Sequence, residues 1–266
     1  DAAMDAARVA PLPEVAAVAG KRLRVSVDGG RARTRHTHRG RGIRPGKNGR
    51  RPFTLEWKEP RVITVDVLDA EGEMDRNWKP IYEVTLGDAD QTCALLEGVL
   101  RAMGAHLAAE VVFVADGAEW IWNRIPAVLA RAGIPTDRVH LTLDYIHAAE
   151  HVSAAIELCR NLTAREGSRL ADELRPLLLD AGGPARVVSQ LRALARGRRG
   201  RKVNREADYL ARHLPHMRYA EMRAVKLPIG SGIVESAVRR VINLRFKSAS
   251  MCWRPAHLLP LLYLRA

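Results

Sequence analysis

The chain has few cysteines and no hydrophobic run that is long enough to cross a membrane. Its three cysteines, Cys93, Cys159 and Cys252, lie far apart and show no metal-ligand spacing. This usage argues against a disulfide framework and a zinc finger, and it favours a reducing compartment. A membrane-spanning helix needs about 18 apolar residues, and a signal peptide needs a basic and then an apolar start. Because neither pattern occurs, we expect a cytoplasmic protein with no membrane partner.

Acidic residues are absent from two long segments of the chain. Residues 31–51 hold nine Lys or Arg and no Asp or Glu, and residues 181–204 are also basic and free of acids. The formal net charge is +13. Such a balance favours polyanionic partners, with nucleic acid first and acidic membrane surfaces second. The alternative is a soluble protein whose genome favours arginine, but the clustering of the charge favours nucleic acid.

The pattern of apolar residues predicts an α/β domain with a helical insertion. Residues 1–20, rich in alanine and proline, predict a peripheral helix or an extended arm, and the missing initiator methionine leaves open a longer chain. Five Gly or Pro residues within 31–51 exclude a helix and predict a flexible cationic loop. Expected strands lie at residues 23–28, 53–58, 61–68, 82–86, 110–116 and 139–144, with helices at 90–103 and 119–132. Residues 146–223 show only helical patterns, so we divide the chain into an arm (1–20), a core (21–145), an insertion (146–225) and the last part of the core (226–266).

Three carboxylates stand out by their positions. Asp28 and Asp116 end predicted strands and precede glycine, and Glu235 follows a Gly-Ser-Gly turn at the start of a basic helix. Functional groups in an open α/β sheet gather beyond the carboxyl ends of the strands. An aspartate before glycine is by itself commonly a turn residue. Together with Glu235 and the basic segments, however, the two aspartates predict a site for two Mg²⁺ or Mn²⁺ ions acting on a phosphodiester.

These residues resemble the Asp-Asp-Glu triad of cut-and-paste transposases with an RNase H-like catalytic domain. The resemblance spans about residues 23–265 and is closest to bacterial insertion-sequence transposases related to the Mutator-like elements. Asp144 and His147 match the Asp-x-x-His motif of that group. The matching blocks are residues 113–123 around the second aspartate, 143–151 just downstream, 230–237 around the glutamate, and 247–253, which closes the domain.

The resemblance implies a fold, a reaction and a partner. The fold would be an RNase H-like mixed sheet flanked by helices, with an all-helical insertion before the glutamate helix. The protein would cleave double-stranded DNA at transposon ends and join 3′-hydroxyls to target DNA, as a bacterial, nucleoid-associated homodimer or larger assembly. Asp28 would contact both ions, Asp116 and Glu235 one each, and Asp144 and His147 would brace the site. Such transposases usually carry an N-terminal region that binds terminal repeats, whereas only some 20 residues precede the first strand here.

The basic segments would neutralise phosphates, so binding should weaken steeply with salt. The residues expected to contact DNA are Arg31, Arg33, Arg35, Arg39, Arg41, Arg196, Arg198, Arg199, Arg201, Lys202, Arg239, Arg240, Arg245 and Lys247.

Two other functions compete with an active transposase. One is a catalytically inactive DNA-binding remnant with the same fold and charge. The other is a zinc metallopeptidase, because His147, Glu150 and His151 form a His-x-x-Glu-His motif in which two histidines would bind zinc and the glutamate would act as base. That interpretation leaves the carboxylates and basic segments unexplained. Trp120 and Trp122 are interpreted as core residues, with stacking on an unpaired base as the alternative.

Overall fold

The computed structural model describes residues 15–159, 162–197 and 200–266. Most of the predicted N-terminal arm therefore lies outside the described residues, and the part of it that is described contains a 3₁₀ turn, η1 (Val15–Val18). Arg198 and Arg199 also lie outside them. Within the described ranges, no helix is both long enough and apolar enough to cross a membrane.

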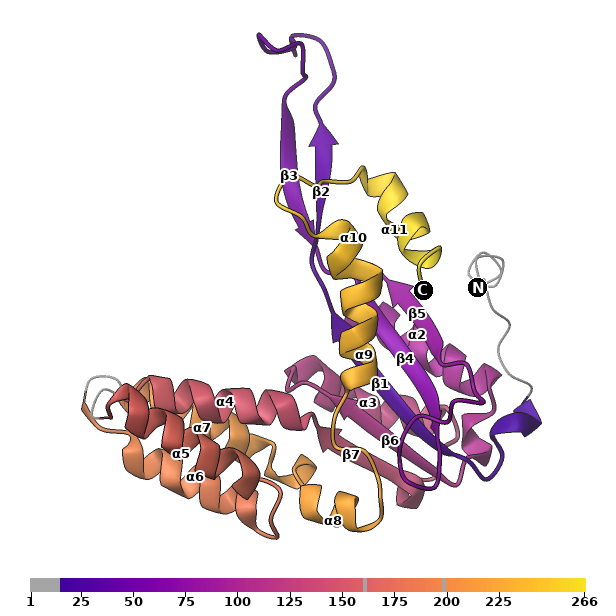
Figure 1. Ribbon diagram of the computed structural model, residues 1–266. Coiled ribbons are helices and arrows are strands. Elements are labelled where there is room, and N and C mark those ends of the chain that lie inside the picture. Colours follow the sequence, from indigo (N-terminus) through magenta and orange to yellow (C-terminus); the bar gives the residue numbers. More distant parts are fainter. Residues whose placement is uncertain (1–14, 160–161, 198–199) are drawn as a thin grey trace.

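A five-stranded mixed sheet forms the centre of the molecule, in the order β5-β4-β1-β6-β7 (Figure 1). β1 is antiparallel to β4 and parallel to β6, which is in turn parallel to β7. The two parallel pairings bring the carboxyl ends of β1, β6 and β7 to one edge of the sheet. The strands are β1 (Arg22–Gly29), β4 (Arg61–Leu68), β5 (Ile81–Thr85), β6 (Glu110–Ala115) and β7 (Val139–Leu143).

Both faces of the sheet are covered. Along β6, Val111 and Phe113 join the cluster beneath α2 (Ala89–Ala102) and α3 (Glu119–Arg131), whereas Val112 and Val114 join a cluster on the other face. This alternation explains why the strand is a continuous apolar run, since residues on both of its faces are buried. α9 (Gly232–Ala237) packs against β1 and β4.

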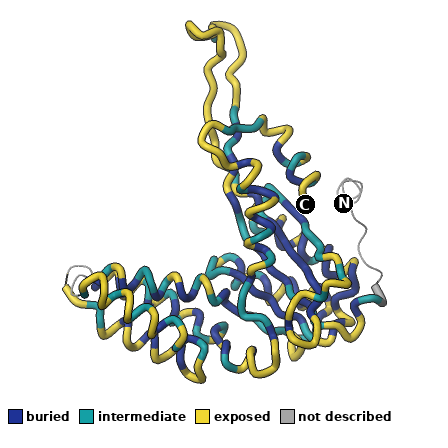
Figure 2. Tube along the Cα trace, viewed as in Figure 1, coloured by how far each residue is buried: buried dark blue, intermediate teal, exposed yellow. Residues whose placement is uncertain are grey.

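A bundle of helices stands beside the sheet and has its own hydrophobic core (Figures 1 and 2). Among the described residues between β7 and α9, no strand forms. The predicted fold class is therefore confirmed: an α/β, RNase H-like mixed sheet flanked by helices, with an all-helical insertion before the Glu235 helix. The bundle contains α4 (Tyr145–Glu157), α5 (Ala164–Leu177), α6 (Gly183–Leu194), α7 (Gly200–Arg212), the 3₁₀ turn η5 (Leu214–His216) and α8 (Tyr219–Ala224).

The Glu235 helix continues beyond α9 without a break. It runs through a π-helical segment, η6 (Val238–Asn243), into α10 (Leu244–Phe246), and α11 (Pro255–Tyr263) follows after a loop. The sequence predicted the basic helix after Glu235. It did not predict the π-helical segment, because the spacing of the apolar residues is also compatible with an ordinary α-helix. Segments of π-helix frequently occur at functional sites.

The prediction of a loop over residues 31–51 was wrong for its first part. β2 (Ala32–Thr37) pairs with β3 (Phe53–Lys58) in an antiparallel hairpin that projects from the body (Figures 1 and 2). The other edge of β2 is bonded to Trp253, whose backbone exchanges hydrogen bonds with Arg33 and Arg35. The two partners of β2, β3 and Trp253, are distant from it in the sequence. The polar sequence of β2 therefore does not predict that it is a strand. Only the glycine-rich tip, residues 38–52, lacks regular structure.

Candidate active site

Three neighbouring parallel strands each have an aspartate at or directly after their carboxyl end, at one edge of the sheet. The registers of β1 with β6 and of β6 with β7 are aligned residue by residue up to the last pair of each ladder. Asp28, Asp116 and Asp144 come directly after those pairs and so form one row. Asp28 and Asp116 therefore lie side by side on adjacent strands.

Asp28 is a half-buried carboxylate in an unfavourable electrostatic environment. Loss of hydration on burial raises its pKa from 3.8 to about 6, and the nearby carboxylates of Asp116 and Glu235 contribute to this increase. The backbone N–H of Gly29, which donates to Oδ1 at 2.6 Å, and the imidazole of His147 act in the opposite direction. The site therefore holds several negative groups close enough to repel one another.

Asp116 begins the turn between β6 and α3. Its Oδ1 accepts a hydrogen bond from the backbone N–H of Ala118 at 3.0 Å. The indole Nε1 of Trp122 donates to the backbone carbonyl of Asp116 at 2.9 Å, and its ring stacks on His216 with centroids 4.2 Å apart. Trp122 and Trp120 are both partly buried against the core beneath α3. Both tryptophans thus pack against the core while each remains partly exposed, and Trp122 holds the Asp116 turn in place.

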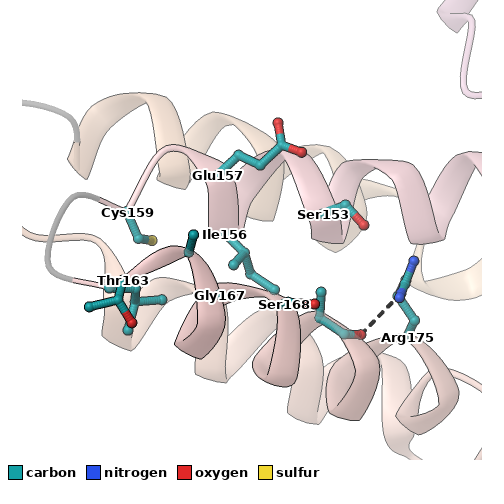
Figure 3. A pocket seen from close by; sticks show the side chains of 11 residues that line it. Ser153, Ile156, Glu157, Cys159, Thr163, Gly167, Ser168 and Arg175 are labelled. Atoms are coloured by element: carbon teal, nitrogen blue, oxygen red, sulfur yellow. Dashed lines mark hydrogen bonds between the residues drawn. The ribbon is translucent and has the colours of Figure 1, made fainter.

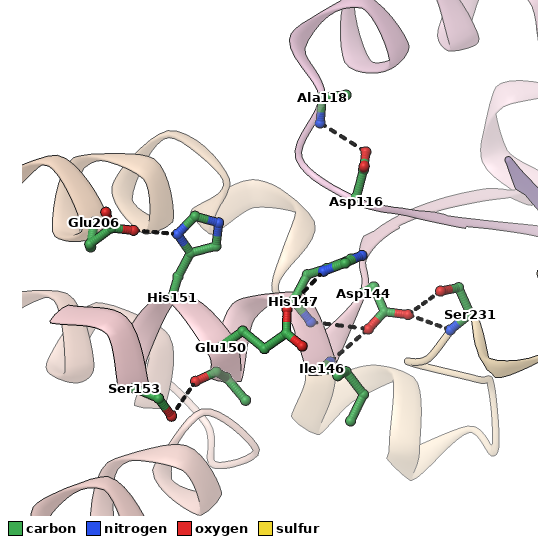
Figure 4. A network of polar contacts seen from close by, with 11 residues as sticks. Asp116, Ala118, Asp144, Ile146, His147, Glu150, His151, Ser153, Glu206 and Ser231 are labelled. Atoms are coloured by element: carbon green, nitrogen blue, oxygen red, sulfur yellow. Dashed lines mark hydrogen bonds and ion pairs between the residues drawn. The ribbon is translucent and has the colours of Figure 1, made fainter. Parts of the chain in front are cut away.

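Asp144 joins the sheet edge to the Glu235 helix (Figure 4). It is fully buried and caps α4, because one carboxylate oxygen accepts from the N–H groups of Ile146 at 2.6 Å and His147 at 3.3 Å. The other oxygen accepts from the backbone N–H of Ser231 at 2.5 Å and from the Ser231 hydroxyl. Ser231 is the residue from which α9 starts. Asp144 therefore fixes where Glu235 lies relative to the strand ends.

Glu235 occupies the first turn of α9 and is exposed. Its pKa is raised by partial loss of hydration and by the carboxylates of Asp144 and Glu150, while His147 lowers it. Within the described part of the chain, no Lys or Arg forms an ion pair with Asp28, Asp116 or Glu235. Asp75 and Glu119 have no such ion pair there either, so the three carboxylates are distinguished by their proximity, since the charges of Asp116 and Glu235 both act on Asp28.

His147 is the imidazole that faces this group of acids. Its Nδ1 lies 3.3 Å from Oε2 of Glu150. Burial lowers its pKa, but Asp144, Glu150 and Asp116 more than offset that effect, so the pKa of His147 is raised overall. A protonated His147 would partly neutralise the field of the carboxylates.

The two histidines of the zinc-peptidase motif have separate partners. Nδ1 of His151 lies 2.6 Å from Glu206, and its ring stacks on Tyr209 with centroids 3.6 Å apart, whereas His147 contacts Glu150 (Figure 4). Across the residues that the structure covers, no group of three or more His, Cys, Asp or Glu side chains is arranged to hold a metal ion. The zinc interpretation thus finds no shared ligand position, and the carboxylates at the sheet edge are candidate ligands and not an assembled metal centre.

The helical insertion packs directly on the turn after Asp116, which sequence reasoning missed. A Cβ on Gly117 would lie 2.0 Å from the hydroxyl oxygen of Tyr209 on α7, so only glycine fits there. His213 lies beside Trp122, with ring centroids 5.5 Å apart. Burial, with smaller effects of His216 and Arg212, lowers the pKa of His213 to about 4. His213 is therefore neutral near pH 7, and the His213-Leu-Pro-His216 spacing was the one sequence signal for this cluster.

The basic residues predicted to bind DNA divide into free and engaged groups. Arg33 belongs to the second group, since its guanidinium donates to the carbonyls of Met251 at 3.2 Å, Ser248 at 3.1 Å and Ala249. Arg35 is also half-buried. The exposed members are Arg31, Arg39 and Arg41 near the hairpin, Arg196, Arg201 and Lys202 on the insertion, and Arg239, Arg240, Arg245 and Lys247 on the Glu235 helix and just after it.

A cavity of about 490 Å³ lies between α4 and α5 (Figure 3). It is lined by Ser153, Ile156, Cys159 and Thr163, among others, and none of the strand-end carboxylates borders it. Arg175 at its rim is paired with Asp172 on its own helix. The cavity therefore brings no reactive set of groups together and is separate from the candidate site.

No protein-family model and no curated protein matches this chain. A solved structure described as a Drosophila P element transposase strand transfer complex is similar over 91% of this chain and 62% of that one, with 12% identity and a TM-score of 0.29. The chain thus spans about three fifths of that protein's length. At this score the likeness carries no argument about this chain, and the candidate site depends on its own geometry.

Proposed function

We propose that this chain is the catalytic domain of a DNA transposase, which cleaves DNA at transposon ends and joins the 3′-hydroxyls to target DNA. One observation carries the proposal. Asp28 and Asp116 lie side by side at parallel strand ends, Asp144 and Ser231 hold the Glu235 helix against the same edge, and no Lys or Arg among the described residues forms an ion pair with the three carboxylates. Carboxylates that lie close enough to repel one another favour a divalent cation as their shared partner.

The donor set fits Mg²⁺ or Mn²⁺. Hard cations of this type prefer carboxylate oxygens, and a pair of them is held about 3.5–4 Å apart in two-metal sites. Asp28 responds electrostatically to both Asp116 and Glu235. Asp28 would therefore contact both ions, Asp116 and Glu235 would contact one each, and the exposed side chain of Glu235 is free to turn toward the aspartates. When bound, the ions would activate water or a 3′-hydroxyl and stabilise the leaving oxygen.

The chain's own groups would position the reactants around these ligands. Asp144 would keep α9 in place, and His147 would moderate the repulsion among the carboxylates through its raised pKa. Arg239 and Arg240 are exposed two and three positions after α9, where they could hold phosphates beside Glu235. DNA would then be retained by the arginines while the carboxylates bind the cations.

Strand cleavage tests the proposal. The chain should nick supercoiled plasmid DNA with Mg²⁺ or Mn²⁺. Asp116→Asn keeps the shape of the side chain but removes its charge, so nicking should be lost while DNA binding is equal or slightly stronger. His147→Ala should reduce nicking less, because a bracing residue matters less than a ligand.

Two results would favour the competing functions. DNA binding without nicking by the parent chain under all these conditions would identify an inactive remnant. Zinc-dependent proteolysis that is lost in His147→Ala but retained in Asp116→Asn would identify a peptidase.

The basic insertion can be tested separately through salt. Replacing Arg196, Arg201 and Lys202 with alanine should weaken DNA binding at every sequence. If each contacts a phosphate, the slope of log affinity against log salt should flatten by about 0.9 per residue. An unchanged slope would show that this cluster is only a solvated surface.

A further inference from the structure

The β2–β3 hairpin presents an aromatic surface to solvent. Its register pairs Trp57 with Arg33, Leu55 with Arg35 and Phe53 with Thr37, so these side chains share one face of the ribbon. The three apolar residues remain 44–56% exposed, although apolar side chains at this spacing usually face a core. We call Phe53 and Trp57 the hairpin face; Leu55 lies between them and carries no ring.

The hairpin face is held in a fixed position. The guanidinium of Arg33 lies over the ring of Trp57 at 5.4 Å, and that of Arg35 lies over the ring of Phe53 at 5.3 Å. Arg33 is itself fixed by the carbonyls of Ser248 and Met251. The rings thus have one side supported while a large part of each remains accessible, which lowers the entropy lost on binding a ligand.

The charge around the hairpin face selects the partner. Residues 31–58 contain ten Lys or Arg and one acid, Glu56. Glu56 is already paired with Lys58 and His36. A second copy of this chain would bring an equally cationic hairpin against the first and be repelled, whereas a polyanion would be attracted.

Aromatic rings distinguish between forms of nucleic acid. In a duplex the base planes are stacked inside, so an exposed ring on a protein surface finds mainly sugars and phosphates. Unpaired bases offer their planes, and sequence-tolerant single-strand sites combine a cationic groove with aromatic residues on which successive bases stack. Phe53 and Trp57 are four residues apart on one strand, about 13 Å at the usual rise, so each could hold its own base.

We propose that the hairpin face binds unpaired DNA, with bases stacked on Trp57 and Phe53 and with phosphates held by the basic tip at Arg39, Arg41 and Arg44. In the proposed transposition reaction, such a site would hold a strand that has been separated from its complement. The inference rests on the proposed function only in requiring DNA as the substrate, since it needs no cleavage and no metal.

Fluorescence anisotropy tests this binding, with a labelled 15-nucleotide single strand and its blunt duplex, in the absence of divalent metal. Trp57→Ala should weaken single-strand binding by roughly 5- to 150-fold, the range for one stacked base. It should change duplex binding by less than about threefold, since duplex binding depends on phosphate contacts. Trp57→Phe should restore most of the lost affinity, and Phe53→Ala should behave like Trp57→Ala.

Leu55→Ala is the matched control, because Leu55 lies on the same strand and face, is 48% exposed, and has no ring. It should change neither affinity by more than about threefold, on the same reasoning. A triple substitution of Arg39, Arg41 and Arg44 by alanine should weaken both affinities. Because these side chains are exposed, equal thermal midpoints would show that every variant is folded.

Three results would overturn the inference. In the first, Trp57→Ala weakens single-strand and duplex binding equally, or weakens neither. In the second, Leu55→Ala and Trp57→Ala have the same effect, which indicates general apolar docking. In the third, Trp57→Ala lowers the oligomeric state in solution and leaves single-strand affinity unchanged, which indicates that the hairpin face contacts another copy of the chain. The whole series can be repeated in the Asp116→Asn chain, so failure of the nicking test and failure of this inference remain distinguishable.

Discussion

Replacing Asp28 with asparagine should stabilise the metal-free protein. In the native state the pKa of this carboxyl is about 6, compared with 3.8 when it is unperturbed. A raised pKa means that the native state holds the proton more tightly than the unfolded state does. The stabilisation that protonated Asp28 gives the native state is therefore fully present below about pH 3.8. It is lost as the pH rises through about 6, because the ionised carboxylate is less stable in the native state than in the unfolded state.

The size of the effect follows from the shift. About two pKa units, at 1.36 kcal/mol each, correspond to about 3 kcal/mol of native-state destabilisation at pH 8. Asparagine has no charge to desolvate, and its side-chain oxygen can still accept the hydrogen bond from Gly29. Because a domain of this size gains about 2–4 °C in melting temperature per kcal/mol, the variant should melt several degrees higher.

Thermal unfolding at pH 5 and pH 8, with and without Mg²⁺, is the assay. At pH 8 the variant should melt above the parent, and the difference should shrink at pH 5, where Asp28 is mostly protonated in the native parent. Mg²⁺ should raise the parent's melting temperature and leave the variant's unchanged, because a ligand that binds only the native state stabilises it. Asp137→Asn, at an exposed aspartate on η3 (Thr136–Arg138), is the control and should alter neither. A variant that melts at or below the parent's temperature at pH 8 would refute the reasoning.

The remaining predictions concern contacts that hold the site. Gly117→Ala should lower stability by about 1–3 kcal/mol in urea denaturation, because its Cβ would clash with Tyr209, whereas Gly98→Ala, in open space on α2, should cost nothing. Asp144→Asn should cost about 1–3 kcal/mol and reduce nicking, since its amide would face the Ser231 donors; full activity would contradict the role of Asp144 in placing Glu235. Arg33→Lys should speed hydrogen exchange of residues 248–253, because lysine cannot bond several carbonyls at once; unchanged protection would contradict that anchoring role.

Local patterns in the sequence were sufficient to predict the central strands and the helical insertion. The apolar run of β6 and the glycine that follows Asp116 predicted a buried strand that ends beside Asp116. The absence of strand patterns between β7 and α9 predicted the helical insertion. Both signals arise within a few residues, since burial on two faces or on one helical stripe appears directly as residue spacing.

Contacts between distant segments could not be predicted in the same way. β2 has a polar sequence, and it is a strand because β3 and Trp253 bond to its two edges. The bond from Ser231 to Asp144 joins residues 87 positions apart, and Tyr209 reaches Gly117 from the insertion. The sequence therefore predicted the identities of the strand-end aspartates but not the contacts that hold the Glu235 helix and the Asp116 turn beside them.

A crystal structure with Mn²⁺ would test the central claim most directly, because the anomalous signal locates the ion. We expect a peak bonded to carboxylate oxygens of both Asp28 and Asp116, and a second peak about 3.5–4 Å away that is bonded to Asp28 and Glu235. Asp116→Asn should lose the first peak. Peaks at His147 and His151, or no peak at the sheet edge at millimolar Mn²⁺, would contradict the proposal that these carboxylates hold the cations of a phosphoryl-transfer reaction.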